Sequence, residues 1–458
     1  MQETVMEPDP TWVRLETDAL GSRKIPRDAL YGIHSLRASE NFNVSGTTLA
    51  SLRPLVKAFA LVKKAAAIAN NRLGLLTDEK ADVIGRVCDE LLAGQHARHL
   101  IVDVFQGGGG TSSHMNLNEI IANRGLELLG YSCGNYEHLH PVDDVNLSQS
   151  TTDVHSTALR IALLFELVEL ENAVSGLAES FAAKGRAFKD DLKLARTHLM
   201  DAVPMKIGEE FTAFSHVLLH DLENTLAMRA GLSQINLGGT IAGSSLSDQP
   251  AFTHAVIGEL EALTSLSLMP AHDLVAAAWN MSDLVGLSAG LKRQAITLSK
   301  ICNDLRLLAS GPNGGIGELS LPPVQAGSPQ IPGKINPVIP EMVNQVAFHI
   351  IGSDVAISLA AEAGQLQRNP FEPMLAYALL GATGMLAKAM KTLAKQCIEG
   401  LMVNLGRSRN MLEHPQTIEN GLVPFIGLKD AHVLAQSISA DTPLSDLLAP
   451  YLARKPKS

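Results

Sequence analysis

The sequence has few aromatic residues, no basic run and few cysteines. Each shortage argues against a class of fold, of partner or of site. Phe, Trp and Tyr make up 4% of the 458 residues, which argues against large sheets, because strands draw on aromatic and β-branched side chains. Lys and Arg total 37 against 47 Asp and Glu, so the formal net charge is −10. Without a basic run, neither nucleic acid nor an anionic membrane is an expected partner.

The cysteines and the N-terminal segment favour a cytoplasmic location. Four cysteines stand far apart and form no metal-ligand or redox spacing, so we expect reduced thiols and no metal site; they are Cys88, Cys133, Cys302 and Cys397. Residues 1–10 are acidic and contain prolines but no apolar core, so no signal peptide is expected. No stretch approaches the roughly 20 uninterrupted apolar residues of a membrane span.

Helical periodicity is what the sequence has in abundance. Apolar side chains recur at spacings of three and four from Leu159 to Phe181, after N-cap candidates at residues 150–153. Further long helices are expected over residues 209–232, 272–310, 337–367 and 374–402. Helices of this length pack best against each other in a bundle, which they can share with other subunits.

The predicted fold class is therefore all-α, with a long-helix bundle core and smaller N- and C-terminal domains. We place a mostly helical N-terminal domain at residues 1–145, the bundle at residues 146–395 and a small C-terminal domain at residues 396–458. The last of these is rich in turn formers after Gly421.

Three polar loops, each leading into a predicted helix, hold most of the candidate site residues. They cover residues 110–116, 144–153 and 327–337 and are dense in hydroxyls and amides. Free N–H groups at a helix N-terminus bind carboxylates well. For any one loop, plain helix capping by Ser and Thr is the simpler interpretation. Three such loops, one of them with a lysine, favour an anion site.

The third loop carries the residues best suited to chemistry. Ser328 can act as a base only if aligned N–H groups stabilise its alkoxide, while Lys334 and Asn336 offer a charge and an amide to a carboxylate. A reaction that removes a proton next to a carboxylate needs such donors, because the carbanion spreads onto the carboxylate as a dianionic enediolate.

A fourth segment places a hydroxyl beside an imidazole. Thr197 directly precedes His198, and Glu341, seven residues beyond Lys334, is a candidate to orient the ring. A lone histidine is more often structural than catalytic, so His198 gains weight only from its neighbours.

These segments resemble the aspartase/fumarase superfamily, most closely its ammonia-lyases that act on aspartate. Residues 327–337, with the sequence GSPQIPGKINP, are similar to the family signature, which is a highly specific motif. The resemblance covers nearly the whole chain and includes residues 31–42, 116–123, 299–308 and 340–346. It implies a bundle of long helices, a homotetramer with active sites built from three subunits, and no metal or organic cofactor. It also implies anti-elimination from a small dicarboxylic acid to give fumarate.

Carried over residue by residue, the resemblance first implies how the substrate is deprotonated and held. Ser328 would be the base that removes the β-proton. Lys334 and Asn336 would bind the α-carboxylate with help from Thr111.

The resemblance also implies roles at the other end of the substrate. Ser150 and Thr151 would bind the β-carboxylate. Thr197 and His198 would lie near the leaving group, with Glu341 behind His198.

The sequence departs from the family pattern inside the site. Thr152 and His114 stand where the family usually has asparagine, and Pro329 stands where it usually has a second serine. Threonine loses the two donors of the amide, and His114 puts a titratable ring beside Thr111. Proline removes a hydroxyl and an N–H from the loop. We count Thr152 and His114 among the substrate-binding residues, and expect the reaction type to be kept while the leaving group or the succinyl skeleton is open to change.

The leading function is therefore a carbon–nitrogen lyase that eliminates ammonia from L-aspartate, or a close relative, to give fumarate. A fumarate hydratase that interconverts malate and fumarate is the nearest alternative, followed by a lyase for an N-substituted or otherwise modified aspartate. A catalytically silent helical scaffold is the alternative from another class, and the retained Ser328 with Lys334 argues against it.

Overall fold

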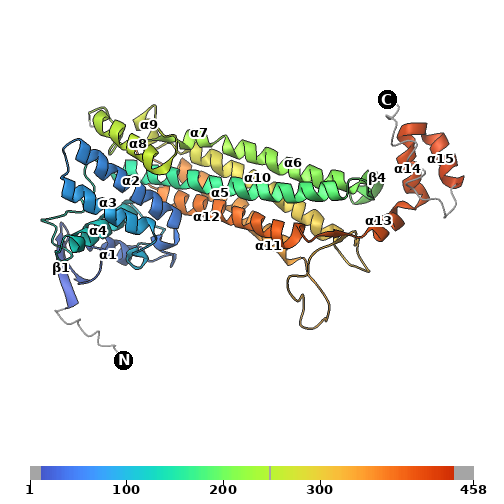
Figure 1. Cartoon of the computed structure of the whole chain (residues 1–458), viewed down its shortest axis with the longest axis horizontal. Helices are drawn as coiled ribbons and strands as arrows, with labels where there is room; N and C mark the ends of the chain where they lie inside the picture. Colours follow the sequence, from blue (N-terminus) through green and yellow to red (C-terminus); the bar gives the residue numbers. More distant parts are fainter. Residues whose placement is uncertain (1–11, 247–248, 438–458) are drawn as a thin grey trace. The chain divides into compact units, whose positions relative to one another are not determined.

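The computed structural model describes residues 12–246 and 249–437 (Figure 1). The chain divides into two compact units, each built from three segments. The first unit comprises Met1–Glu169, Asn224–Leu291 and Ile351–Gly384, and the second comprises Leu170–Glu223, Lys292–Ile350 and Met385–Ser458. The division predicted at residues 145 and 395 stays a prediction.

Long helices dominate the described part of the chain and confirm the predicted all-α class. The predicted ones are α5 (Thr151–Ala187), α6 (Ile207–Leu226), α10 (Ser282–Leu308), α11 (Val338–Glu362) and α12 (Glu372–Leu393), which are labelled in Figure 1. The predicted stripe of α5 is buried: Leu159 is 1% exposed, and Leu163, Leu167 and Phe181 are fully buried. Burial of such a stripe is the main source of helix stability in a protein.

The helices predicted to end near residues 367 and 402 end earlier, at Glu362 and Leu393. Two other predicted helices are divided in the structure. The helix predicted over residues 272–310 starts too early, because the Asn280 Oδ1 accepts the backbone N–H of Ser282 and begins a new helix there. The short α9 (Leu274–Ala277), capped by the Asp273 carboxylate, precedes this break. The helix predicted over residues 209–232 is likewise divided, into α6 and the short α7 (Arg229–Leu232).

Shorter elements complete the first unit. A two-stranded antiparallel sheet pairs β1 (Val13–Asp18) with β2 (Gly21–Pro26). The helices are α1 (Ile33–Asn41), α2 (Arg53–Arg72), α3 (Asp78–Leu92), α4 (Thr111–Leu128) and α8 (Pro250–Thr264). Helix α2 packs against both α3 and α8.

In the second unit, a hairpin packs against the last described helices. Its strands are β3 (Leu192–Thr197) and β4 (Met200–Lys206), which pair antiparallel. Leu194 on β3 shares a buried apolar cluster with residues of α13 (Leu405–Leu412), α14 (Pro415–Ile426) and α15 (Leu428–Ser437). This cluster fixes the base of the hairpin.

Within residues 12–246 and 249–437, two helices are long and apolar enough to cross a membrane by length and composition alone. They are Val338–Glu362 and Glu372–Ile398, each with a mean hydropathy of 1.2 in the best window. A buried core helix passes the same test, and 67% of the second window is buried against 33% of the first. On α11, Phe348, Val355 and Leu359 are 60%, 62% and 64% exposed and follow one another at spacings of seven and four.

Candidate active site

The structure divides the predicted site residues between the two units. Thr111, His114, Ser150, Thr151 and Thr152 lie in the first unit, and Thr197, His198, Ser328, Lys334, Asn336 and Glu341 lie in the second. Each group is built from loops that open a helix or close a hairpin.

In the first unit, two of the predicted loops meet where α4 and α5 begin. The His114 Nδ1 lies 2.9 Å from the Thr151 Oγ1. Thr111 is exposed at the start of α4, and its hydroxyl donates to the carbonyl of Gly108 at 2.8 Å. The turn before it has positive φ angles of 79°, 61° and 95° at Gly108, Gly109 and Gly110, which glycine adopts without strain.

Asp153 holds the start of α5 against the segment of residues 238–240. Its carboxylate accepts backbone N–H groups from Ser150 at 2.9 Å, Gly238 at 3.2 Å and Thr240 at 3.1 Å. Burial raises the pKa of Asp153 to about 6, although these N–H groups favour the anion. The Ser150 hydroxyl donates to the carbonyl of Thr240 at 2.7 Å. Ser150 and Thr151 are thus held at the N-terminus of a long helix, where an anion is stabilised.

A buried lysine that the sequence reasoning missed lies behind His114. Lys63 on α2 is fully buried, and its Nζ lies 2.6 Å from the His114 Nε2 and 2.9 Å from the Asn146 Oδ1. Burial lowers the pKa of both Lys63 and His114, and the nearby Lys63 lowers that of His114 further. A sequence signal existed: Lys63 and Asn70 share the helix face of Phe59, which is otherwise apolar.

A second buried group that the sequence reasoning missed joins α5 to α12. The His155 Nδ1 lies 2.9 Å from a Glu372 carboxylate oxygen, and both side chains are at most 1% exposed. Arg368 pairs with the other oxygen of Glu372 at 3.1 Å and donates to the backbone carbonyls of Thr152 and Gly109. The carboxylate thus ties the first turn of α5 to the glycine loop.

The same loop lies directly against His155. A β-carbon on Gly110 would lie 2.2 Å from the His155 Cδ2, so no other residue fits there beside the ring. Phe59 packs against both imidazoles, with ring centroids 6.2 Å from His114 and 5.5 Å from His155.

In the second unit, Thr197 and His198 lie at the exposed tip of the hairpin. The turn consists of His198 and Leu199, with positive φ angles of 55° and 64°. This is the geometry of a two-residue hairpin turn that Asn-Gly adopts most readily. Side chains other than glycine cost about 1–2 kcal/mol each in this conformation. The turn therefore presents His198 at the tip of the hairpin at the cost of backbone strain.

The base of this hairpin is held by buried charges. Glu318 is 2% exposed and pairs with Arg196 at 3.0 Å and with Lys193 at 3.6 Å. Lys193 also pairs with Glu210 at 2.7 Å. Two carboxylates, Glu318 and Glu210, therefore face the two cations of β3, and Glu318 is shared between them.

The loop with the family signature is closed at its neck by its own backbone. The Gly327 N–H donates to the carbonyl of Lys334 at 3.0 Å, and the Asn336 amide donates to the carbonyl of Gly327 at 2.9 Å. A β-carbon at Gly327 would lie 2.4 Å from that Lys334 oxygen. Ser328 is half-buried and accepts the backbone N–H of Gln330 at 3.2 Å, while Lys334 is exposed.

Glu341, the predicted partner of His198, lies in the first turn of α11. There the Arg306 guanidinium faces its carboxylate at 3.9 Å, with both side chains 40% exposed. Its role toward His198 stays a prediction.

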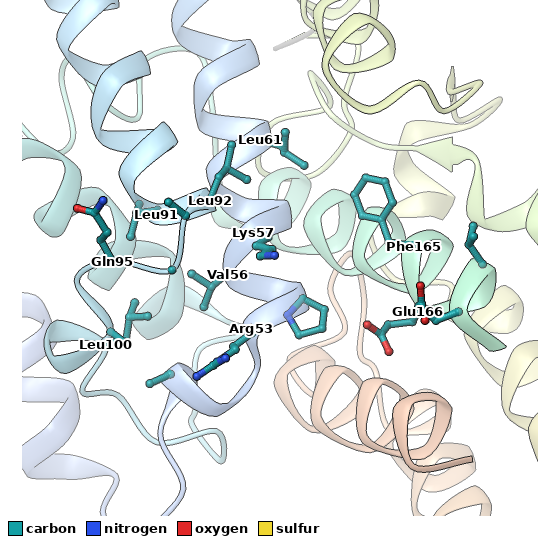
Figure 2. Close-up of a pocket in the computed structure, with 17 residues that line it drawn as sticks. Arg53, Val56, Lys57, Leu61, Leu91, Leu92, Gln95, Leu100, Phe165 and Glu166 are labelled. Atoms are coloured by element: carbon teal, nitrogen blue, oxygen red, sulfur yellow. The ribbon is translucent and has the colours of Figure 1, made fainter. Parts of the chain in front are cut away.

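The pocket shown in Figure 2 is separate from these residues. It has a volume of about 830 Å³, and none of the predicted site residues lines it. Arg53, Lys57 and Leu61 of α2 face Phe165 and Glu166 of α5 across it (Figure 2). Among the described residues, no group of three or more His, Cys, Asp or Glu side chains is placed to hold a metal ion.

Comparison with known proteins identifies the relatives of this chain. A family model described as Lyase matches residues 21–352. The aspartate ammonia-lyase of Pseudomonas aeruginosa is 45% identical over 425 residues, which cover 93% of this chain and 90% of the relative. That of Escherichia coli K12 is 42% identical over 431 residues, which cover 94% and 90%.

Solved structures of similar proteins agree with the fold. The fumarate lyase:delta crystallin from Brucella melitensis bound to cobalt has a TM-score of 0.89 at 44% identity, covering 97% of this chain and 96% of that one. The class II fumarase from Schistosoma mansoni has a TM-score of 0.88 at 29% identity, covering 96% of each chain.

Proposed function

The chain belongs to the aspartase/fumarase superfamily of lyases, and from this membership we infer that it eliminates ammonia from L-aspartate to give fumarate. The observation that carries the inference is the 45% identity to an aspartate ammonia-lyase over 93% of this chain. The retention of Ser328 and Lys334 in the signature loop supports an active enzyme rather than a silent scaffold.

The reaction we propose begins at the β-carbon of aspartate. An alkoxide of Ser328 takes the β-proton, and the electron pair spreads onto the adjacent carboxylate as an enediolate. The pair then returns to form the carbon–carbon double bond, while the carbon–nitrogen bond breaks and ammonia leaves. The Gln330 N–H, which donates to the Ser328 Oγ at 3.2 Å, is the kind of donor that makes such an alkoxide more accessible.

Two sets of donors hold the carboxylates in this proposal. Ser150 and Thr151, at the N-terminus of α5, bind the β-carboxylate, where the charge of the enediolate develops. Lys334 and Asn336, with Thr111, bind the α-carboxylate. The exposure of Lys334 supports this role, because its ammonium is available to a ligand.

The leaving amine is assigned to the hairpin turn. Thr197 and His198 lie near it, and Glu341 orients His198. Thr152, which is 8% exposed, and His114 form one wall of the proposed site. We call it the altered wall, because the family usually has asparagine at both positions. We propose that this wall and Pro329 shift the preference of the site from L-aspartate toward a relative that differs in its leaving group or succinyl skeleton.

A fumarate hydratase is the second candidate, favoured by the likeness to the Schistosoma fumarase at 29% identity. The aspartate ammonia-lyases are more similar, at 41–45%. Because water and ammonia are both small leaving groups, the same donors serve either reaction.

We further propose a cytoplasmic homotetramer in which three subunits contribute to each site. Support comes from the apolar stripe of α11, exposed at Phe348, Val355 and Leu359. Sedimentation analysis tests this assembly, and a monomer that retains full activity contradicts it.

The function itself is tested by following fumarate in the ultraviolet. Purified protein is incubated with L-aspartate, and separately with fumarate plus either ammonia or water, and the adduct is identified. Fumarate from L-aspartate, at ordinary aspartase rates, supports the proposal and removes the idea of altered specificity. Malate as the only adduct replaces the proposal with the hydratase. A panel of amines identifies a modified aspartate as the substrate.

A further inference from the structure

Lys63 is a buried cation in the first unit that the proposed reaction does not use. It is fully buried on α2, as are Phe59, Val62 and Ala66 of the same helix. Burying an ammonium costs several kcal/mol unless hydrogen bonds replace its water. The contacts that replace it, to His114 and Asn146, therefore carry information about what the lysine does.

The direction of each hydrogen bond from Lys63 follows from its partners. The Asn146 amide nitrogen donates to the carbonyl of Gln149 at 3.1 Å, which turns its Oδ1 toward Lys63. Lys63 therefore donates one N–H to Asn146. As an ammonium, Lys63 has three N–H groups and no acceptor, so a second N–H donates to the His114 Nε2, 2.6 Å away.

This second bond selects the tautomer of His114. A neutral imidazole has one acceptor and one donor nitrogen. When Nε2 accepts from Lys63, Nδ1 carries the proton and donates to the Thr151 Oγ1, 2.9 Å away. The ring is held in place by Phe59, stacked at 6.2 Å with an interplanar angle of 15°. Burial lowers the pKa of His114 and favours this neutral ring.

The consequence falls on Thr151. Its oxygen accepts from His114, so its own O–H is left to donate elsewhere. Thr151 is half-buried at the first position of α5, beside Ser150, whose hydroxyl already donates to Thr240. We propose that Lys63 and His114 are positioning residues that hold the Thr151 hydroxyl as a donor toward a substrate carboxylate, a role that rests on the proposed function.

The experiment is a double-mutant cycle with a binding readout. Calorimetry measures the affinity for succinate, a dicarboxylate without a leaving group, in the full-length wild type, Lys63→Met, Thr151→Val and the double variant. Turnover of L-aspartate is measured on the same four proteins. Because Thr151→Val removes a hydrogen bond to a charged group, it should bind succinate at least about tenfold more weakly than the wild type. Lys63→Met should weaken binding about three- to tenfold in the wild type but less than about twofold in the Thr151→Val background.

Each outcome decides between the two claims. Effects that add in the double variant, or a Thr151→Val variant with unchanged succinate affinity, overturn the positioning role even if turnover persists. A non-additive cycle without any turnover of L-aspartate supports the role and overturns the proposed reaction. A wild type that binds no succinate and turns over no aspartate overturns both.

Control variants separate positioning from structure. Lys64→Met removes the neighbouring lysine, which pairs with Asp89 at the surface, and should leave succinate affinity unchanged. Thr151→Ser keeps the hydroxyl and should restore binding. If Lys63→Met does not fold, His114→Phe keeps the stacking on Phe59 and interrupts the same chain of hydrogen bonds, with the same expected cycle against Thr151→Val.

Discussion

The two parts of the candidate site are held in opposite ways. In the first unit, Lys63 and His114 are at most 1% exposed and are linked to one another through their side chains. In the second unit, Lys334 and His198 are exposed, and it is the backbone around them that is fixed. The comparison teaches that a site can be preorganised by buried side-chain partners or by constrained loop ends.

The two solutions have different costs. Removing one partner from a buried polar network lowers the stability of the protein. The remaining partner is then left without a hydrogen bond, and water cannot reach it to replace the bond. An exposed side chain on a constrained loop can be removed with little effect on folding. Activity and stability should therefore separate in the exposed loops and change together in buried networks.

The largest effect is expected from Ser328→Ala in the exposed loop. Removal of a general base lowers kcat by about a hundredfold to ten-thousandfold, while the unfolding midpoint should stay that of the wild type. Steady-state kinetics and a thermal melt measure both. Ser180→Ala, at another partly buried serine, is the matched control, and an equal loss in both variants would show that the assigned base is wrong.

Glu318→Gln tests whether buried charge at the base of the hairpin behaves like the network of the first unit. The change leaves Arg196 and Lys193 without their shared carboxylate and should lower the free energy of unfolding by about 3–5 kcal/mol. Glu179→Gln breaks an exposed pair with Arg186 and should cost less than about 1 kcal/mol. Denaturant unfolding gives both values, and similar values for the two would remove the distinction.

Asp153→Asn tests the first unit through pH. The pKa of Asp153 is raised from 3.8 to about 6 in the folded protein, so the folded state binds more protons than the unfolded state between these pH values. The contribution of Asp153 to stability is therefore complete below pH 3.8 and is lost as the pH rises to 6.

The wild type should lose stability relative to Asp153→Asn, by on the order of 3 kcal/mol, between pH 4 and 7. Melts across this range measure the difference. Asp190→Asn, at an exposed carboxylate, controls for the loss of one negative charge. A wild type that gains stability relative to Asp153→Asn over this range would mean that the carboxylate is stabilised as the anion.

The smallest effect is expected at the hairpin turn. Leu199→Gly removes the cost of a left-handed side chain but adds the entropic cost of glycine, so a net gain of roughly 0.5 kcal/mol in stability is expected. Ala202→Gly, in the extended strand β4, should lower stability instead. Denaturant midpoints distinguish the two, and a loss at both positions would mean that the turn is not strained.

Local patterns predicted much of the fold but not the buried partners. The stripe from Leu159 to Phe181 predicted α5 because its spacing is a property of one segment. The break before Ser282 depends on one side-chain cap at Asn280, which periodicity does not detect.

The same difference between local patterns and long-range contacts applies to the candidate site. The motif around Ser328 is local and could be recognised. His155 and Glu372 are 217 residues apart in sequence, and Lys63 and His114 are 51 apart, so only folding brings them together.

The fit of His155 against the glycine loop has a consequence for how this sequence can change. The ring occupies the space that a β-carbon at position 110 would need, so the residue at each position limits what can stand at the other. Among descendants, a larger residue at 110 is admissible only after 155 has become smaller, and the positive φ at 110 narrows that route further. Relatives that share this arrangement are best sought by the pair, glycine at 110 with histidine at 155, and not by either residue alone.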